Sequence, residues 1–213
     1  MSLIHEFRRK ALHLFACIIP CGLYFFPEEI AFPLLLSVTA AAVAVESLRR
    51  YSPSLQALFM RLFGPLLRAH EATSFTGSTS LLLSSSLCAM ILLDTRGGAW
   101  ILTHAARVSL FYAFSFIILG DAAAAIFGKL FGKRTIMGKK TWVGTFACFA
   151  AGCAIYMLSL LFISDPPFFG LVFFIAALTA LLEAVPVNLD DNLFVPPFTC
   201  FSLYLLLEKG LCP

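Results

Sequence analysis

The chain has 213 residues, of which 60% are hydrophobic and only 13% are charged, and its formal net charge is +3. Soluble domains carry about 25% charged residues, and a globule of this size with so few polar side chains could not cover its exterior with them. The composition therefore excludes an ordinary soluble domain and predicts an integral membrane protein with a single helix bundle.

Apolar runs that approach the length needed to cross a bilayer occur seven times along the chain. The first run follows Arg8, Arg9 and Lys10, as in a secretory signal. However, His13 interrupts it and Pro-Glu-Glu stands where a cleavage site needs small residues, so we expect a retained helix. The predicted fold class is all-α, a polytopic membrane bundle in one transmembrane domain, residues 1–213. About seven transmembrane helices are expected, at residues 11–26, 31–48, 77–93, 101–120, 142–163, 168–185 and 194–208, with residues 121–130 continuing the fourth.

Residues 53–68 differ from these spans, because leucine and phenylalanine recur there at helical spacing while Gln56, Arg61 and Arg68 fall elsewhere. This pattern predicts an amphipathic helix lying in the membrane interface. The Gly64-Pro65 pair is expected to break it.

The cations are distributed unequally over the predicted loops. If the N-terminus is cytoplasmic, that side carries 12 of the 15 Lys and Arg residues, and the opposite side keeps Arg96, Arg107 and Lys209. The positive-inside rule therefore predicts an N-terminus in the cytoplasm and a C-terminus on the other side. The unusual polar stretches then all emerge on the cytoplasmic face.

Asp121 stands at the end of the fourth apolar run and is followed by four alanines. A carboxylate within or at the edge of a membrane is costly and is usually functional or paired. Two interpretations stay open. Asp121 is a Mg²⁺ ligand or a catalytic acid or base, or it forms a structural salt bridge with a lysine of the following loop.

Glycines and cations alternate from Gly128 to Gly144, and phosphate sites need both residue types. Gly-Lys-Lys-Thr resembles the end of a P-loop, but Lys133 stands where that motif needs glycine and the context is helical, so we exclude it. The alternative is a plain cationic loop, at about residues 128–141. The candidate phosphate-binding residues are Lys129, Lys133, Gly138, Lys139, Lys140, Thr141 and Gly144.

Three carboxylates and an amide follow the sixth span, namely Glu183, Asp190, Asp191 and Asn192. Oxygen ligands of this kind suit Mg²⁺ rather than zinc. The alternative is a solvated turn that caps the seventh helix.

Three weaker clusters complete the predicted cytoplasmic face. Arg9 and His13 open the first helix, where they bind phosphate or only anchor the chain. Glu46 and Arg49 form an i,i+3 pair that is equally compatible with a structural role. Arg68 precedes a Thr-Gly turn that binds a phosphate or caps the third helix.

Together these stretches resemble the superfamily of CTP-dependent lipid-alcohol kinases, which includes dolichol, phytol and CTP-dependent diacylglycerol kinases. Residues 8–13 look like its Arg-Lys-x-x-His pattern, and residues 68–83 look like its charged segment followed by a Thr-Gly turn. Residues 120–133 are similar to its Gly-Asp-x-x-Ala segment and glycine-lysine loop. The more specific resemblances are residues 138–145, to Lys-[Ser/Thr]-x-x-Gly-[Thr/Ser], and residues 190–196, to Asp-Asn-Leu-x-x-Pro.

The resemblance implies Mg²⁺-dependent transfer of a phosphoryl group from CTP or another nucleotide to a lipid alcohol, such as a polyprenol, a phytol-like alcohol or diacylglycerol. Lys139 and Lys140 would hold phosphates, Asp121 with Asp190 or Asp191 would hold the metal, and Asp121 or Glu183 would be the base. The expected partners are the lipid, the nucleotide and the bilayer, without nucleic acid; a homo-oligomer stays open.

Two alternatives are kept. Cytidylyltransferases that make CDP-diacylglycerol are distantly similar, but the chain lacks their long C-terminal signature. A small transporter of an anionic metabolite would use the same cations, but it would need polar residues at the midplane of several helices, where this chain is apolar.

Overall fold

The computed structural model describes residues 9–11, 13–67, 69–94, 100–138, 140–185 and 190–209, without the side chains of residues 69 and 70. Residues 9–11 and 13–15 are helical. The further helices are α2 (Ile18–Phe25), α3 (Glu28–Tyr51), α4 (Pro53–Phe63), η1 (Gly64–Leu66), η2 (Ala69–Ala72), α5 (Gly77–Leu92), α6 (His104–Phe131), α7 (Trp142–Ser159), α8 (Phe169–Ala184) and α9 (Asp191–Glu208).

The predicted all-α class is confirmed, with two short antiparallel hairpins that the sequence did not predict. One pairs β1 (Leu93–Asp94) with β2 (Ile101–Leu102), and the other pairs β3 (Thr135–Met137) with β4 (Lys140–Thr141). Gly138 stands between β3 and β4 with a φ of 56°, in the left-handed region that glycine adopts without strain. Part of the predicted cationic loop is therefore a hairpin.

Helices occur within all seven predicted spans, but the described residues contain three that are long and apolar enough to cross a membrane. These are α3, α6 and α7, judged by length and composition. The apolar helices α5 and α8 are shorter, and α2 has only 8 residues. Seven membrane spans therefore stay a prediction. Two finer predictions are confirmed, since α6 continues to Phe131 and the helix that begins at Pro53 breaks at Gly64-Pro65.

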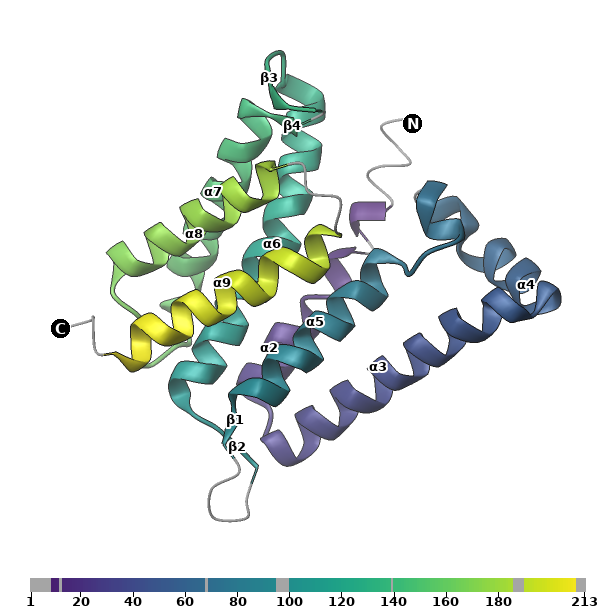
Figure 1. Cartoon of the computed structure of the whole chain (residues 1–213). Coiled ribbons are helices and arrows are strands. Elements are labelled where there is room, and N and C mark those ends of the chain that lie inside the picture. The colour runs from purple at the N-terminus through teal and green to yellow at the C-terminus, as the bar shows by residue number, and fades with distance from the viewer. Residues whose placement is uncertain are drawn as a thin grey trace.

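The central helix is α6, which packs against α2, α5, α7, α8 and α9. Large side chains such as Tyr112, Phe114 and Ile117 are fully buried along it. In contrast, α3 packs mainly beside α5, and Figure 1 shows it at one side of the bundle with α4 at its far end. The β1–β2 and β3–β4 hairpins lie at opposite ends of α6 (Figure 1).

Glycines allow α6 and α7 to approach closely. A Cβ atom added at Gly144 would lie 2.9 Å from the carbonyl oxygen of Ala124, and one added at Gly128 would lie 2.9 Å from Thr141 Oγ1. Thr141 is the N-cap of α7, because its hydroxyl accepts a hydrogen bond of 3.1 Å from the Gly144 N–H. This packing accounts for both glycines without a bound phosphate.

Candidate functional site

Asp121 lies in α6 and is buried, with its side chain 13% exposed, and it faces the N-terminal helical residues. The ammonium of Lys10 donates a hydrogen bond to Asp121 Oδ2, and Nε2 of His13 lies 3.8 Å from the same oxygen. Lys10 and His13 are three residues apart, so they share one helical face. The carboxylate is thus paired, but with a lysine from the N-terminal segment and not with the loop after α6.

A second charged cluster joins β4, α8 and α9. Lys140 donates hydrogen bonds to Glu183 Oε1 and, at 3.3 Å, to Asp191 Oδ2. Burial lowers the pKa of the Lys140 ammonium, but the two carboxylates outweigh this effect and hold the pKa above its ordinary value. The Glu183 side chain is buried, and its second oxygen, Oε2, has no hydrogen-bond partner among the described residues.

The N-termini of α5 and α9 meet beside these clusters. Asp190 Oδ1 accepts a 2.9 Å hydrogen bond from the N–H of Asn192, which caps α9, and Glu71 Oε1 accepts one of 2.8 Å from the N–H of Gly77. A Cβ atom at Gly77 would lie 2.8 Å from Asn192 Nδ2 and 3.4 Å from Glu71 Oε1. Glycine at position 77 therefore leaves room for both side chains.

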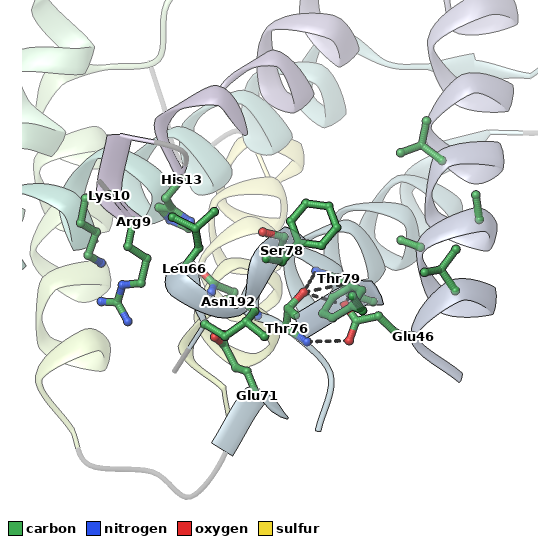
Figure 2. A pocket seen from close by; sticks show the side chains of 18 of the residues that line it. Arg9, Lys10, His13, Glu46, Leu66, Glu71, Thr76, Ser78, Thr79 and Asn192 are labelled. Atoms are coloured by element: carbon green, nitrogen blue, oxygen red, sulfur yellow. Dashed lines mark hydrogen bonds between the residues drawn. The ribbon is translucent and has the colours of Figure 1, made fainter. Parts of the chain in front are cut away.

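A pocket of about 590 Å³ opens between these N-termini, Asp121 and the C-terminal part of α3. Figure 2 shows Lys10, Arg9 and His13 on one side of it and Glu71, Thr76, Thr79 and Glu46 on the other, with Asn192 between them. The polar side chains on its lining are Arg9, Lys10, His13, Glu46, Glu71, Thr76, Ser78, Thr79, Asp121 and Asn192, and the apolar ones are Val38, Ala41, Ala42, Val45, Phe59, Phe63, Leu66 and Leu67. The pocket is therefore amphiphilic.

The residues predicted for the site fall into five groups. Arg9, His13, Asp121 and Asn192 line the pocket, whereas Lys140, Glu183 and Asp191 form the neighbouring charged cluster and Asp190 caps α9. Thr141 and Gly144 belong to the α6–α7 contact. Lys129, Lys133 and Gly138 are exposed, with Lys133 against a separate hollow beside Trp142. Arg68 and Lys139 lie outside the described residues.

The pocket contains hard oxygen donors, namely the carboxylates of Asp121 and Glu71 and the amide of Asn192. Among the described residues, however, no three His, Cys, Asp or Glu side chains are close enough together to hold a metal ion. In phosphate sites Mg²⁺ takes one or two carboxylates and completes its shell with phosphate oxygens and water. The donors fit such a shared ion but not a cage made by the protein alone.

Three charged pocket residues, Lys10, Glu46 and Glu71, were not among the predicted site residues. Lys10 carried a signal, because it is three residues before His13 on the same helical face. Glu46 carried a similar signal as the i,i+3 partner of Arg49. Their contacts with Asp121 and Thr76 join segments 111 and 30 residues apart, which spacing within one helix cannot predict.

Comparison with known proteins finds relatives among lipid kinases. The chain is 30% identical over 105 residues to "Probable phytol kinase 1, chloroplastic" from Oryza sativa subsp. japonica, a match that covers 44% of this chain and only 33% of the rice protein. It is 27% identical over 221 aligned positions to "CTP-dependent diacylglycerol kinase 1" from Schizosaccharomyces pombe, covering 95% of this chain and 94% of that protein. No protein-family model matches the chain. No solved structure matches it significantly.

Proposed function

We propose, from this homology with CTP-dependent lipid kinases at low identity, that the chain phosphorylates a membrane lipid alcohol in the pocket beside Asp121. The relatives support a lipid kinase, and the apolar helices support a membrane protein. The observation that carries the proposal is one pocket in which an apolar wall, a cationic edge and a buried carboxylate meet. A lipid alcohol and a nucleotide need these three surfaces together.

The apolar wall suits the tail of the acceptor. It comes from one face of α3, at Val38, Ala41, Ala42 and Val45, and from Phe59 and Phe63 of α4. An alkyl or prenyl chain against this wall would be removed from water, which contributes about 0.8 kcal/mol per buried CH₂ group. The hydroxyl at its end would then lie among the polar side chains near Asp121.

The cationic edge suits the phosphates of the donor. Arg9, Lys10 and His13 line the pocket from the N-terminal helical residues. Arginine and lysine neutralise phosphate charge, and phosphoryl transfer depends mainly on such neutralisation and on in-line positioning. We infer CTP as the donor from the relative that carries CTP in its name. Lys140, whose charge is balanced by Glu183 and Asp191, would add to the positive charge of this edge from the neighbouring charged cluster.

Asp121 would act as the general base for the acceptor. Its carboxylate would take the proton of the lipid hydroxyl while the hydroxyl oxygen bonds to the γ-phosphorus. The bond from that phosphorus to the bridging oxygen would break, and the nucleoside diphosphate would leave. Lys10, which contacts Asp121, would keep the carboxylate oriented and balance negative charge during the transfer.

Mg²⁺, if bound, would neutralise the donor phosphates. Glu71 and Asn192 would hold it, since both line the pocket and both lie against Gly77. We do not assign it to Asp190 and Asp191, because the pocket is lined by Glu71 and Asn192 and not by these two aspartates. This assignment moves the predicted metal ligands away from the aspartate pair.

We also propose that residues 1–213 form one membrane-embedded catalytic unit with its active site on the cytoplasmic side. The cation distribution supports this orientation. The exposed Leu58, Leu62 and Phe63 of α4 support its place in the membrane interface.

The test is to identify the product. Purified protein in lipid nanodiscs is incubated with γ-labelled CTP, ATP, UTP or GTP and with phytol, a short polyprenol or diacylglycerol, with and without Mg²⁺. We expect the label on a lipid phosphate, identified by mass. If no lipid is labelled with any of the four nucleotides while the protein stays folded, the proposal is overturned. With phosphatidic acid as the acceptor and unlabelled CTP, a cytidylyl group on the lipid phosphate, identified by mass, would instead identify nucleotidyl transfer.

A further inference from the structure

Glu46 and Arg49 form a buried ion pair on the side of the pocket opposite Lys10 and Arg9, where α3 meets the segment before α5. Glu46 is 3% exposed and Arg49 is 1% exposed, which makes Arg49 one of the largest fully buried side chains among the described residues. Nη2 of Arg49 lies 3.1 Å from Glu46 Oε2. Neither residue belongs to the chemistry proposed above.

The carboxylate of Glu46 holds the beginning of α5. It accepts hydrogen bonds from the N–H of Thr76 at 3.0 Å, from the hydroxyl of Thr76 at 2.7 Å and from the hydroxyl of Thr79. Figure 2 shows these bonds at the edge of the pocket. Thr76 is the N-cap of α5, so Glu46 fixes the position of that helix end relative to α3.

The guanidinium of Arg49 holds the turn before α5. It donates to the carbonyl oxygens of Glu71, Ala72 and Ser74 at 2.9, 3.0 and 2.8 Å. It also donates to Gln56 Oε1 at 3.1 Å and lies 4.3 Å from the ring centroid of Phe59, both in α4. One side chain therefore connects α3, α4 and the turn that carries Glu71.

The pair joins the two sides of the pocket. The apolar wall is formed by α3 and α4, and the opposite polar side includes Glu71 and Gly77. The hydrogen bonds of the pair described above go to α4, to the turn before α5 and to the beginning of α5, on the side of the pocket away from Lys10 and Arg9 (Figure 2). A change in the pair should therefore shift the wall relative to Glu71 and leave the cationic edge in place.

Stability alone does not account for a buried ion pair of this kind. Its desolvation penalty offsets most of its attraction, and well-packed apolar side chains of similar size often stabilise as much. What the pair adds is a fixed geometry, since the planar guanidinium holds several acceptors in defined directions.

We propose that Glu46 and Arg49 are positioning residues that set the gap between the apolar wall and the polar side of the pocket, and that they thereby determine how tightly the lipid alcohol binds. The inference rests on the proposed lipid kinase function. With that function, the pair acts mainly on lipid binding, because the acceptor lies in that gap while the nucleotide phosphates lie at the cationic edge. Loss of the pair raises KM for the lipid more than KM for the nucleotide, since Arg9, Lys10 and His13 still face the donor phosphates when Glu71 shifts.

The test compares Arg49→Lys with Arg50→Lys, a matched change at the next residue, which is exposed. Lysine keeps the charge at position 49 but cannot bond several carbonyls in fixed directions. We expect KM for the lipid alcohol to rise about tenfold, as for a small misplacement of a binding surface, with KM for the nucleotide within twofold and Arg50→Lys like the wild type. Equal changes in both KM values, or none, would overturn the inference while the kinase function stands.

A milder variant covers the case in which Arg49→Lys does not fold. Thr79→Val removes one hydroxyl donor to Glu46 and keeps the size of the side chain. It should raise KM for the lipid about two- to threefold, a loss of the size expected for one hydrogen bond, and again spare the nucleotide. Equilibrium binding of a fluorescent lipid alcohol separates the two hypotheses. If the wild-type protein neither binds nor phosphorylates lipid alcohols, both the proposed kinase function and the inference are wrong. If Thr79→Val is an active enzyme that binds the lipid alcohol as tightly as the wild type does, only the inference is wrong.

Discussion

Replacing Gly144 with alanine tests whether the glycines between α6 and α7 serve helix packing or phosphate binding. The new Cβ atom would lie 2.9 Å from the carbonyl oxygen of Ala124 and 3.2 Å from Thr141 Oγ1. Ordinary contacts of this kind begin at 3.4 Å, so relief requires a separation of 3.4 − 2.9 = 0.5 Å. The carbonyl is part of the α6 backbone and cannot rotate away. The two helices must therefore move apart.

The cost follows from this geometry. Overpacking a tight contact by one methyl group costs about 1–3 kcal/mol, and the gain in helix propensity on replacing glycine returns at most about 1 kcal/mol. We expect a net loss of stability of about 1–2 kcal/mol, which in a chain of this length lowers the melting temperature by about 2–8 °C. Because α7 follows β4 directly, the shift should also move Lys140 relative to Asp121.

The assay is thermal denaturation of the purified protein in detergent without nucleotide. Gly22→Ala in α2 is the matched control, since nothing lies within 4 Å of its added Cβ atom. The control should melt at the wild-type temperature or above it. If Gly144→Ala melts like the wild type but raises KM for the nucleotide, the packing explanation is wrong and the glycine serves ligand approach.

Three further predictions concern the charged cluster and the α5–α9 contact. Lys140→Gln should destabilise the protein by about 3 kcal/mol. This is the lower end of the range for breaking a buried pair, because the Lys140 side chain is 32% exposed. Adding Glu183→Gln should restore most of the lost stability in thermal melts in detergent, and no restoration would refute the coupling between Lys140 and Glu183. Since the folded-state pKa of Lys140 lies above its ordinary value of 10.5, the stabilisation is fully present below pH 10.5 and is lost as the pH rises further. The difference in stability between the wild type and Lys140→Gln should therefore be constant from pH 7 to 9, and a difference that grows with pH in this range would contradict the sign. Gly77→Ala would bring a Cβ atom to 2.8 Å from Asn192 Nδ2, so turnover should fall about tenfold or more; wild-type turnover would show that the position of the Asn192 amide is unimportant.

The parts of the fold that depend on local composition could be predicted from the sequence. Long apolar runs predicted the helices, and the Gly64-Pro65 pair predicted the break after α4. The β3–β4 hairpin could not be predicted, because strands of two or three residues show no alternation and the surrounding cations indicate only a solvated loop. The number of membrane spans remains a prediction, because α2 is short and α9 contains Pro196 and Pro197 after an acidic start.

The candidate site could be predicted as a set of stretches but not as a set of contacts. The sequence indicated that the polar clusters share one face, and the structure brings together Lys10 with Asp121 and Lys140 with Glu183. Which lysine meets which carboxylate depends on how helices distant in the sequence pack, and periodicity within one helix does not determine this. The glycines were ambiguous for a similar reason, since a small residue admits a phosphate or a neighbouring helix equally well.

The most direct test of the central claim is turnover by Asp121→Asn under conditions in which the wild type phosphorylates a lipid alcohol. Asp165→Asn, an exposed carboxylate in the α7–α8 connection, is the matched control. The proposed role predicts that Asp121→Asn is destabilised by the loss of its ion pair with Lys10. Where it is folded it should still bind nucleotide but lose at least about 100-fold in kcat, as for the loss of a general base, while the control is unaffected. Lipid phosphorylation by Asp121→Asn within a few-fold of the wild type would contradict the role of this pocket as the catalytic centre.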